Sequence, residues 1–252
     1  MKRIRIIVQY EGTAYVGWQT QPNGLAVQER IEKELKKLTG EAITLHASGR
    51  TDSGVHALAQ VAHFDTESRI PPDKFCYALN VGLPPDIRIL YSGEAEGFHS
   101  RFDVKRKHYC YSVQLSPHAS AFTRNTALHV HTALDLDAMK EAAALFVGEH
   151  DFAAFKAAGT TVESTVRTVY RSEWIKEGSL LRYHVAGSGF MYNMVRILVG
   201  TMIEVGQGRR DVFSVAKALS SGNRKDAGPT APAHGLMLRR VEYEGFDTED
   251  YI

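Results

Sequence analysis

The sequence of 252 residues contains only two cysteines and lacks any long apolar run. Cys76 and Cys110 lie far apart and outside CxxC spacing, so the sequence predicts neither a disulfide framework nor a zinc knuckle. The most apolar stretch, residues 195–205, is interrupted by charged and glycine residues and is too short for a membrane span. The apolar run at residues 6–8 is too short for a secretion signal. We therefore expect a soluble, cytoplasmic protein.

The sequence also lacks an excess of charge of either sign. Thirty Lys and Arg residues face 29 Asp and Glu residues, which gives a formal net charge of +1. This total gives no support for a polyanionic partner, because phosphate binding requires clustered basic residues. The average hides a basic stretch, residues 190–241, and an acidic C-terminal segment, residues 242–252. On charge alone, a solvated basic surface without any nucleic-acid role is the simpler interpretation.

Motifs for nucleotide cofactors, acyl transfer and metals are missing or incomplete. The sequence has no P-loop, no complete GxGxxG pattern and no Gly-x-Ser-x-Gly pattern. His129 and His131 place two imidazoles on one face of an extended segment, but the sequence offers no third and fourth ligand at zinc-like spacing. The sequence therefore predicts no metal site and no nucleotide cofactor.

Hydrophobic periodicity divides the chain into two successive sets of elements, each in the order β-α-β-β-α-β of a ferredoxin-like fold. The first set comprises strands at 3–9, 43–47, 60–65 and 87–91 and helices at 27–38 and 72–79. The second set comprises strands at 108–115, 165–175, 181–186 and 236–243 and helices at 136–146, 191–205 and 212–219.

This order predicts an α+β fold of two ferredoxin-like halves, residues 1–105 and 106–252. We expect the halves to share a mostly antiparallel sheet with helices on one side and a central active-site cleft. No sequence identity between the halves is visible, so the repeat rests on element order alone.

The densest polar cluster is residues 48–56, with the sequence SGRTDSGVH. A plain turn between two strands explains these residues without any function. The alternative is that the turn holds Asp52 rigidly at the rim of the sheet, with Arg50 on the same face of an extended segment. An arginine there favours the ionised carboxylate that a nucleophile requires. The residues alone leave both interpretations open.

A second cluster, residues 101–111, joins basic side chains to tyrosines on an expected strand. Such tyrosines are commonly half-buried sheet residues. The functional alternative is that Tyr109 stacks on an RNA base while the basic residues hold phosphates. The basic residues are Arg101, Lys105, Arg106 and Lys107.

A third segment, residues 187–200, has the sequence GSGFMYNMVRILVG and mostly the pattern of a packed helix. Arg196 is the exception within this apolar helix. Its head either reaches solvent or, if buried, requires a paired carboxylate. Asp52 is the partner that we expect.

Several segments together form an ordered set along nearly the whole chain. They are YEGTAYVGWQ at 10–19, GRTDSGVHA at 49–57, FHSRF at 98–102, YCY at 109–111, DF at 151–152, FMYNMVR at 190–196 and APAHGL at 231–236. The set resembles the tRNA pseudouridine synthase A family. Ser53, Cys110 and Met191 depart from the residues usual there, and Ser53 bears only on the packing of its loop.

The resemblance implies an isomerase that converts uridine to pseudouridine at positions 38, 39 and 40 in the anticodon stem-loop of tRNA. It also implies a homodimer that uses neither metal nor organic cofactor. Matched by motif, Asp52 corresponds to the catalytic aspartate, Arg50 and Arg196 to active-site arginines, and Tyr109 to the tyrosine that packs against the target base. Extruding that base from a stem costs roughly a few kcal/mol, part of which stacking on Tyr109 offsets.

Two other classes of function fit part of the sequence. A noncatalytic RNA-binding protein would keep the scaffold and the basic face without needing Asp52. A hydrolase that uses Asp52 and His56 would release free uracil. If the RNA assignment is right, the four basic residues of the second cluster line the same cleft as Asp52, and the acidic C-terminal segment lies elsewhere.

Overall fold

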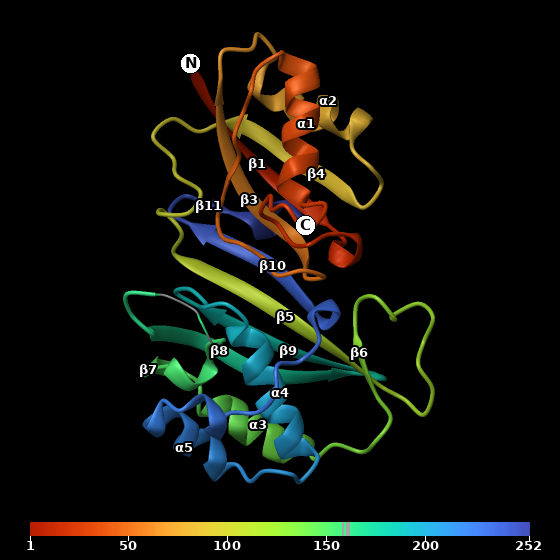
Figure 1. The fold of residues 1–252 in the computed structure, drawn as a ribbon, viewed down its shortest axis with the longest axis vertical. Helices are drawn as coiled ribbons and strands as arrows, with labels where there is room; N and C mark the ends of the chain where they lie inside the picture. The colour runs from red at the N-terminus through yellow and green to blue at the C-terminus, as the bar shows by residue number, and fades with distance from the viewer. Residues whose placement is uncertain (158, 160–161) are drawn as a thin grey trace. The chain divides into compact units, whose positions relative to one another are not determined.

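The computed structural model of the protein describes residues 1–157, 159 and 162–252 (Figure 1). Contacts divide the chain into two compact units. Unit 1 comprises residues 1–107 and 237–252, and unit 2 comprises residues 108–236. The described residues contain both α-helices and β-strands, and most of the strand pairs are antiparallel. The expected α+β composition is therefore confirmed.

The sheet of unit 1 is built around two long antiparallel strands, β1 and β3. β1 also pairs antiparallel with β4, while β3 pairs antiparallel with β2 near one end and parallel with β10 near the other. β11 forms a short hairpin with β10. The strands are β1 (Lys2–Tyr10), β2 (His46–Ala47), β3 (His56–Thr66), β4 (Ile87–Glu94), β10 (Leu236–Tyr243) and β11 (Phe246–Asp247).

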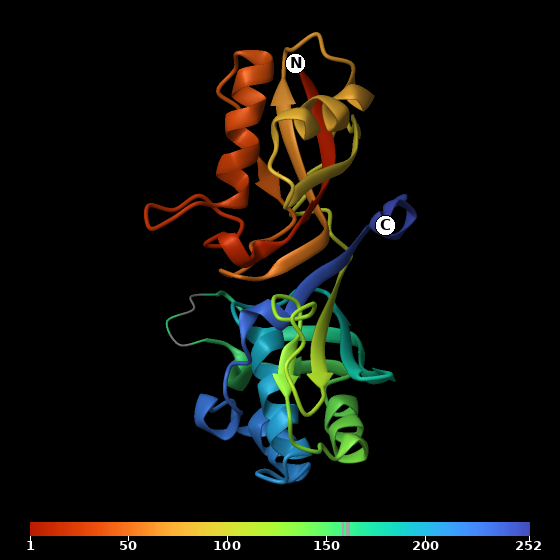
Figure 2. The ribbon, with the colours of Figure 1, turned by 90° about the vertical axis from the view of Figure 1, so that its right-hand side faces the viewer.

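Two helices, α1 (Val27–Thr39) and α2 (Phe75–Gly82), cover one face of this sheet (Figures 1 and 2). α1 buries the side chains of Val27, Ile31 and Leu35, which recur at helical spacing on its inner face. It ends at Gly40, whose φ of 77° is the left-handed conformation of a glycine C-cap. The sequence predicted this helix to within one residue.

The C-terminal residues belong to the contacts of unit 1. Phe246 lies with its ring centroid 3.4 Å from the guanidinium carbon of Arg5 on β1, and Tyr251 lies 4.6 Å from Tyr91 between ring centroids. Such cation–π contact offsets the cost of burying a guanidinium. Residues 237–252 therefore belong to the same contact unit as residues 1–107. The order of elements in the sequence had instead assigned the final strand to the second half, residues 106–252.

Unit 2 has the strand order β5-β9-β8-β7, with β6 paired parallel to β5. Helix α3 packs against β8 and α4. The strands are β5 (Arg106–Leu115), which begins in unit 1, β6 (Leu128–Val130), β7 (Gly148–Asp151), β8 (Val166–Glu177) and β9 (Leu180–Gly187). The helices are α3 (Leu136–Ala144), α4 (Met194–Gly206) and α5 (Phe213–Ser221).

Helix α4 is the most deeply packed helix of unit 2. Nearly all of its residues are buried, and a Cβ at Gly200 would lie 1.9 Å from the carbonyl oxygen of Pro229. The prediction that this helix begins at residue 191 was wrong, because Asn193 adopts φ 60° and helical geometry starts only at Met194. In the part of the chain that the structure describes, no helix has the length and apolar character needed to cross a bilayer.

The core of unit 1 gives a matched test on one helix. Leu35 is fully buried, whereas Leu38 on the same helix is 38% exposed. We expect Leu35→Ala to lower the free energy of unfolding by about 2–5 kcal/mol, because it removes buried methyl groups and leaves a cavity. Leu38→Ala should cost less than about 1 kcal/mol. Urea denaturation of both variants measures the difference, and equal losses would contradict the burial of this face.

Candidate functional site

The polar segment 48–55, which joins β2 to β3, is in direct contact with residues 10–18. An added Cβ at Gly12 would lie 2.0 Å from the carbonyl oxygen of Val55, and one at Gly17 would lie 2.4 Å from that of Thr51. Gly17 also has a φ of +106°, which favours glycine. The two backbones can therefore approach this closely only because both positions lack a side chain.

Hydrogen bonds join the same two segments. The backbone N–H of Trp18 donates to the carbonyl of Thr51 at 3.2 Å, and that of Gly54 donates to the carbonyl of Tyr15 at 3.3 Å. The hydroxyl groups of Tyr10 and Thr51 are 2.7 Å apart and both are buried. Buried polar groups in such a network hold one geometry, because losing a partner leaves an unpaired group.

Side chains from β3 and β5 hold the segment from another direction. Lys107 donates from Nζ to the carbonyl of Ser48 at 2.6 Å, and Gln60 donates from Nε2 to the carbonyl of Gly49 at 2.8 Å. Burial lowers the pKa of Lys107 to about 8, with a further contribution from the charge of Arg101. Lys107 thus supports the backbone of the segment.

These contacts fix the backbone on both sides of Asp52. The carbonyl of Asp52 accepts the N–H of Val55 at 3.1 Å in a tight turn that passes through Gly54 at φ 77°. The Asp52 side chain is half-buried and that of Arg50 is exposed. The arrangement combines a rigid backbone with a carboxylate at its centre, which is the geometry that a nucleophile requires.

His56 follows the turn and begins β3. It is 2% exposed, and its Nδ1 accepts the backbone N–H of Gly12 at 2.9 Å. The Nδ1 atom therefore stabilises the contact between the two segments. This role weakens the hydrolase interpretation, in which His56 would act on substrate together with Asp52.

In unit 2, Arg196 lies in the first turn of α4 and is half-buried. Its Nε donates to the carbonyl of Ala231 at 2.7 Å, and its Nη1 donates to Oδ1 of Asn193 at 2.8 Å. The backbone N–H of Ala231 donates to the carbonyl of Arg196 at 3.0 Å. The guanidinium is thus held by the backbone of the 231–236 motif, and its expected ion pair with Asp52 stays a prediction.

The tyrosines of β5 are buried in unit 2. Tyr109 meets Phe190 edge to face, with ring centroids 5.3 Å apart. Tyr111 donates its hydroxyl to the carbonyl of Pro232 at 2.9 Å, and burial raises its pKa. The motif segments 109–111, 190–196 and 231–236 therefore meet within one unit, although they are far apart in the sequence.

Comparison with known proteins shows which family carries these motifs. The model of a family described as tRNA pseudouridine synthase matches residues 6–103 and 142–244. The chain belongs to the tRNA pseudouridine synthase family. The matched ranges include the segment around Asp52 and the segment around Arg196.

Individual relatives agree over almost their full length. The chain is 49% identical to tRNA pseudouridine synthase A of Ruminiclostridium cellulolyticum, over 96% of this chain and 100% of the relative. It is 47% identical to the protein of the same name from Citrifermentans bemidjiense, over 97% of this chain and 98% of the relative. A crystal structure of the archaeal box H/ACA sRNP Nop10-Cbf5 complex matches with a TM-score of 0.39 at 9% identity, covering 92% of this chain and 59% of that chain.

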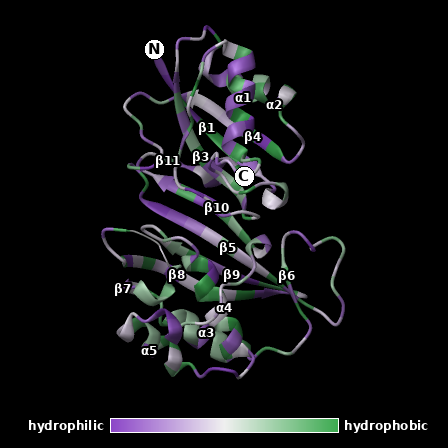
Figure 3. Ribbon diagram, in the orientation of Figure 1, coloured by the Kyte–Doolittle hydropathy of each residue, from purple (hydrophilic) through white to green (hydrophobic). Residues whose placement is uncertain are grey.

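From the sequence of this member of the tRNA pseudouridine synthase family, we predicted that four basic side chains lie near Asp52. They are Arg101, Lys105, Arg106 and Lys107. Of the four, Lys107 contacts the segment 48–55 directly, while Arg101, Lys105 and Arg106 are exposed. Figure 3 shows that β5 begins with a hydrophilic stretch. Nζ of Lys105 lies 3.6 Å from a carboxylate oxygen of Glu244, and Nε of Arg106 lies 3.9 Å from one of Glu242.

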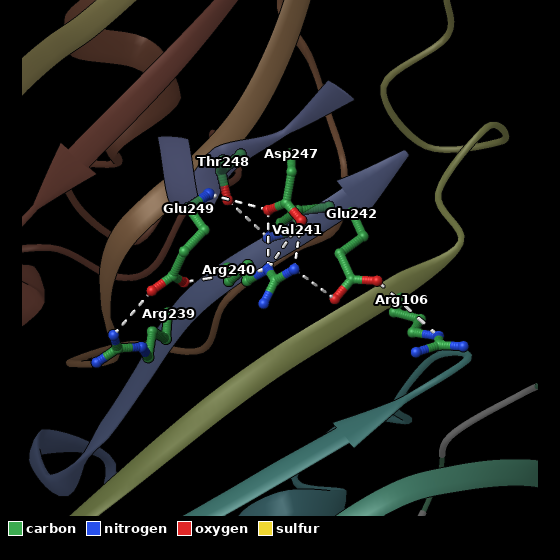
Figure 4. Close-up of polar contacts among 8 residues, drawn as sticks. All are labelled: Arg106, Arg239, Arg240, Val241, Glu242, Asp247, Thr248 and Glu249. Atoms are coloured by element: carbon green, nitrogen blue, oxygen red, sulfur yellow. Dashed lines mark hydrogen bonds and ion pairs between the residues drawn. The ribbon is translucent and has the colours of Figure 1, made fainter. Parts of the chain in front are cut away.

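The expectation that the acidic C-terminal segment lies away from these basic residues was wrong. Figure 4 shows Arg240 between the carboxylates of Asp247 and Glu242, with Arg106 beyond Glu242. The reason is local: Lys105 donates its backbone N–H to the carbonyl of Glu242 at 2.8 Å, which brings the two charged stretches together. The Lys105–Glu244 pair is exposed on both sides and contributes roughly 0–1 kcal/mol to stability.

Three histidines lie beside this basic run and were not among the predicted site residues. The ring centroids of His46 and His63 are 5.1 Å apart, and those of His63 and His99 are 4.8 Å apart. Nδ1 of the buried His63 accepts the backbone N–H of Ser100 at 3.2 Å. Burial lowers the pKa of His63 to about 4, assisted by the charges of Arg3, His99 and His46. Among the described residues, no group of three or more His, Cys, Asp and Glu could hold a metal ion.

Sequence reasoning did not predict how the candidate site is supported, because it gave Gly12 and Gly17 only as part of a motif and His56 only as a residue of the hydrolase alternative. Gly12, Gly17, Gln60 and His56 make the contacts that hold the segment 48–55. The available signal was the YEGTAYVGWQ motif itself, in which two glycines lie within a short aromatic segment. The role of the motif depends on a partner more than 30 residues away, which no local pattern specifies.

Gly17 gives a test of the close backbone contact. Gly17→Ala adds a Cβ against the carbonyl of Thr51 and forces a positive φ on alanine, so we expect a loss of at least about 2 kcal/mol in the free energy of unfolding. Gly97→Ala is the matched control, since Gly97 also has a positive φ but an added Cβ there meets open space. That variant should lose about 1 kcal/mol. Chemical denaturation compares the two, and equal losses would contradict the contact.

His63 gives a test of pH dependence. Its folded pKa of about 4 lies below the ordinary value of 6.5, so the unfolded chain binds more protons between these values. Stability should therefore fall as the pH is lowered from about 6.5 towards 4. We expect a shallower fall in His63→Gln than in the wild type, measured by urea denaturation from pH 7 to pH 5. His118→Gln, at an exposed position, should follow the wild type. Parallel profiles for all three proteins would contradict the assignment.

Proposed function

We propose that this chain isomerises uridine to pseudouridine in tRNA, at positions 38, 39 and 40 of the anticodon stem-loop. Membership of the tRNA pseudouridine synthase family supports the reaction, and near-complete coverage of relatives named tRNA pseudouridine synthase A supports the substrate. The structural observation that carries the proposal is the segment 48–55, whose backbone is fixed on both sides of one carboxylate.

The proposed catalytic nucleophile is Asp52. The reaction breaks the bond between N1 and C1′, forms a bond between C5 and C1′, and moves the C5 proton to solvent while N1 gains one. Composition and oxidation state do not change, so the chemistry needs no redox partner and no water as reactant. Asp52 attacks C1′ of the ribose or C6 of the uracil, or stabilises the departing base.

Other side chains have proposed roles around this carboxylate. Arg196 would neutralise Asp52, and its bonds to Ala231 and Asn193 hold the guanidinium in one orientation. Tyr109 would stack on the target base once it is extruded. Arg50, exposed beside the turn, would fill the place that the base vacates.

The basic run would contact the RNA backbone. Arg101 is exposed and would bind phosphate directly, whereas Lys105 and Arg106 would exchange their carboxylate neighbours for phosphates. Lys107 would act mainly through the segment 48–55, since its Nζ donates to Ser48.

The remaining parts of the proposal concern architecture. In unit 1, the strand order β4-β1-β3-β2 with two helices on one face supports a ferredoxin-like half. We extend this to two such halves, residues 1–105 and 106–252, with a central cleft. We also propose a homodimer that acts in the cytoplasm without metal or organic cofactor.

Asp52→Asn tests the nucleophile. The amide keeps the shape of the carboxylate but cannot form the covalent bond, so pseudouridine formation should fall at least about a thousandfold. The dissociation constant for tRNA should stay within about threefold. Tritium release from tRNA that carries 5-tritiated uridine measures the reaction, and filter binding measures affinity.

Asp73→Asn is the control for this experiment, because Asp73 is 65% exposed and pairs with Lys74 at the surface. It should keep wild-type activity. Activity in Asp52→Asn would refute the nucleophile, and wild-type protein that binds tRNA without releasing tritium would indicate a noncatalytic RNA-binding protein. Mass analysis separates isomerisation, which leaves the mass of the RNA unchanged, from hydrolysis, which removes uracil.

A further inference from the structure

Phe102 is a large aromatic side chain left open to solvent in unit 1. Phe102 is 75% exposed, although it belongs to a hydrogen-bonded turn. One face of its ring is stacked on His99, with ring centroids 4.2 Å apart and an angle of 29° between the rings. The stacking covers one side of the ring, so the exposure of Phe102 lies mainly on its other face.

Ring contacts continue from Phe102 and His99 to the buried His63, although His99 meets His63 edge to face. His99 contacts His63, whose ring is stacked at 24° on that of His46 in β2. β2 leads directly into the segment 48–55, and His46 precedes Asp52 by six residues. Even a fully extended chain of that length spans no more than about 22 Å. This cluster of rings is therefore attached to the same part of unit 1 that holds the proposed nucleophile.

The turn that carries Phe102 is fixed by its own hydrogen bonds. Nδ1 of His99 accepts the backbone N–H groups of Arg101 and Phe102 at 3.2 and 3.3 Å. Oδ2 of Asp103 accepts the N–H of His99 at 2.7 Å, and Ser100 donates its hydroxyl to the carbonyl of His46. A ligand that binds here would lose little free energy to ordering the turn, because the turn is already ordered.

The segment around Phe102 carries exposed cationic side chains. The guanidinium carbon of Arg101 lies 5.8 Å from the centroid of the Phe102 ring, and the exposed Lys105 follows on the same segment. A flat aromatic ring beside cationic groups matches the chemistry of an unpaired nucleobase with its phosphates, since the ring stacks on the base and the cations bind the backbone. An apolar protein segment would match the ring but would offer no anionic group to the guanidinium of Arg101.

We propose that Phe102 and His99 form a stacking platform for an unpaired base of the tRNA substrate, separate from the uridine that is isomerised. This proposal rests on the proposed function and adds a second contact to it. The platform holds a neighbouring base of the same stem-loop, while Arg101 binds the adjacent phosphate. It thereby fixes the position of the RNA relative to Asp52 without taking part in the chemistry.

The test uses three variants of the full-length protein and an unmodified tRNA transcript. Phe102→Ala should raise the dissociation constant about 5- to 100-fold, the range for loss of one base–aromatic stack. The dependence of affinity on salt should keep the wild-type slope, because no phosphate contact is removed. Phe122→Ala, at a 97% exposed phenylalanine without a ring partner in the described residues, should bind tRNA as the wild type does.

Phe102→Trp should keep the affinity and report contact directly. Trp18 and Trp174 are buried, at 2% and 3% exposure, so the emission of an exposed tryptophan at position 102 is distinguishable from theirs. Addition of tRNA should quench that emission. The ellipticity of each variant in circular dichroism should match the wild type, since the substituted side chain packs on only one face.

Two results would overturn the platform proposal. One is wild-type affinity for tRNA in a folded Phe102→Ala variant, and the other is tryptophan emission of Phe102→Trp that tRNA does not quench. A changed oligomeric state of Phe102→Ala in sedimentation with unchanged tRNA affinity would also overturn it and assign Phe102 to an interface between copies of the chain. The failure of the proposed function is a different result, namely wild-type protein that binds tRNA and releases no tritium. Wild-type protein that does not bind tRNA would overturn both proposals.

Discussion

The contact between residues 10–18 and the segment 48–55 is the constraint on which the candidate site depends. Two glycines, Gly12 and Gly17, let the backbones touch at a distance that any side chain would prevent. Lys107 and Gln60 then satisfy carbonyls at the start of the same segment. A turn of small polar residues, which would otherwise be a flexible connection, becomes a rigid support for one carboxylate. The cost of ordering that carboxylate is therefore met during folding, before any substrate binds.

The fold was predictable where local pattern decides it. The spacing of Val27, Ile31 and Leu35, followed by Gly40, specifies α1 because those residues interact within one helix and its cap. β7 and β11 were missed, since strands of four and two residues are too short to show an alternation that distinguishes them from loops. The grouping of residues 237–252 with unit 1 depends on contacts such as Phe246 with Arg5, which are distant in sequence.

The residues of the candidate site were predicted from motifs and not from hydrophobic periodicity. Asp52 and Arg196 were identified from residue type and from motif resemblance, and family membership is now shown. What residue type does not reveal is how such side chains are held: Arg196 by the carbonyl of Ala231, and the Asp52 turn by glycines more than 30 residues away. Charge was the least predictable feature, because Glu242 lies beside Arg106 although the total charge suggested nothing about either.

The central claim is that a carboxylate on this rigid segment isomerises uridine in the anticodon arm. It is tested most directly by incubating the purified protein with an unmodified tRNA transcript that carries uridines 38, 39 and 40, and mapping pseudouridine at each nucleotide. The account predicts that pseudouridine forms at these positions without any added cofactor. It also predicts that the mass of the RNA does not change. Uridine left unchanged at all three positions by folded, tRNA-binding protein, or RNA that has lost uracil, would contradict it.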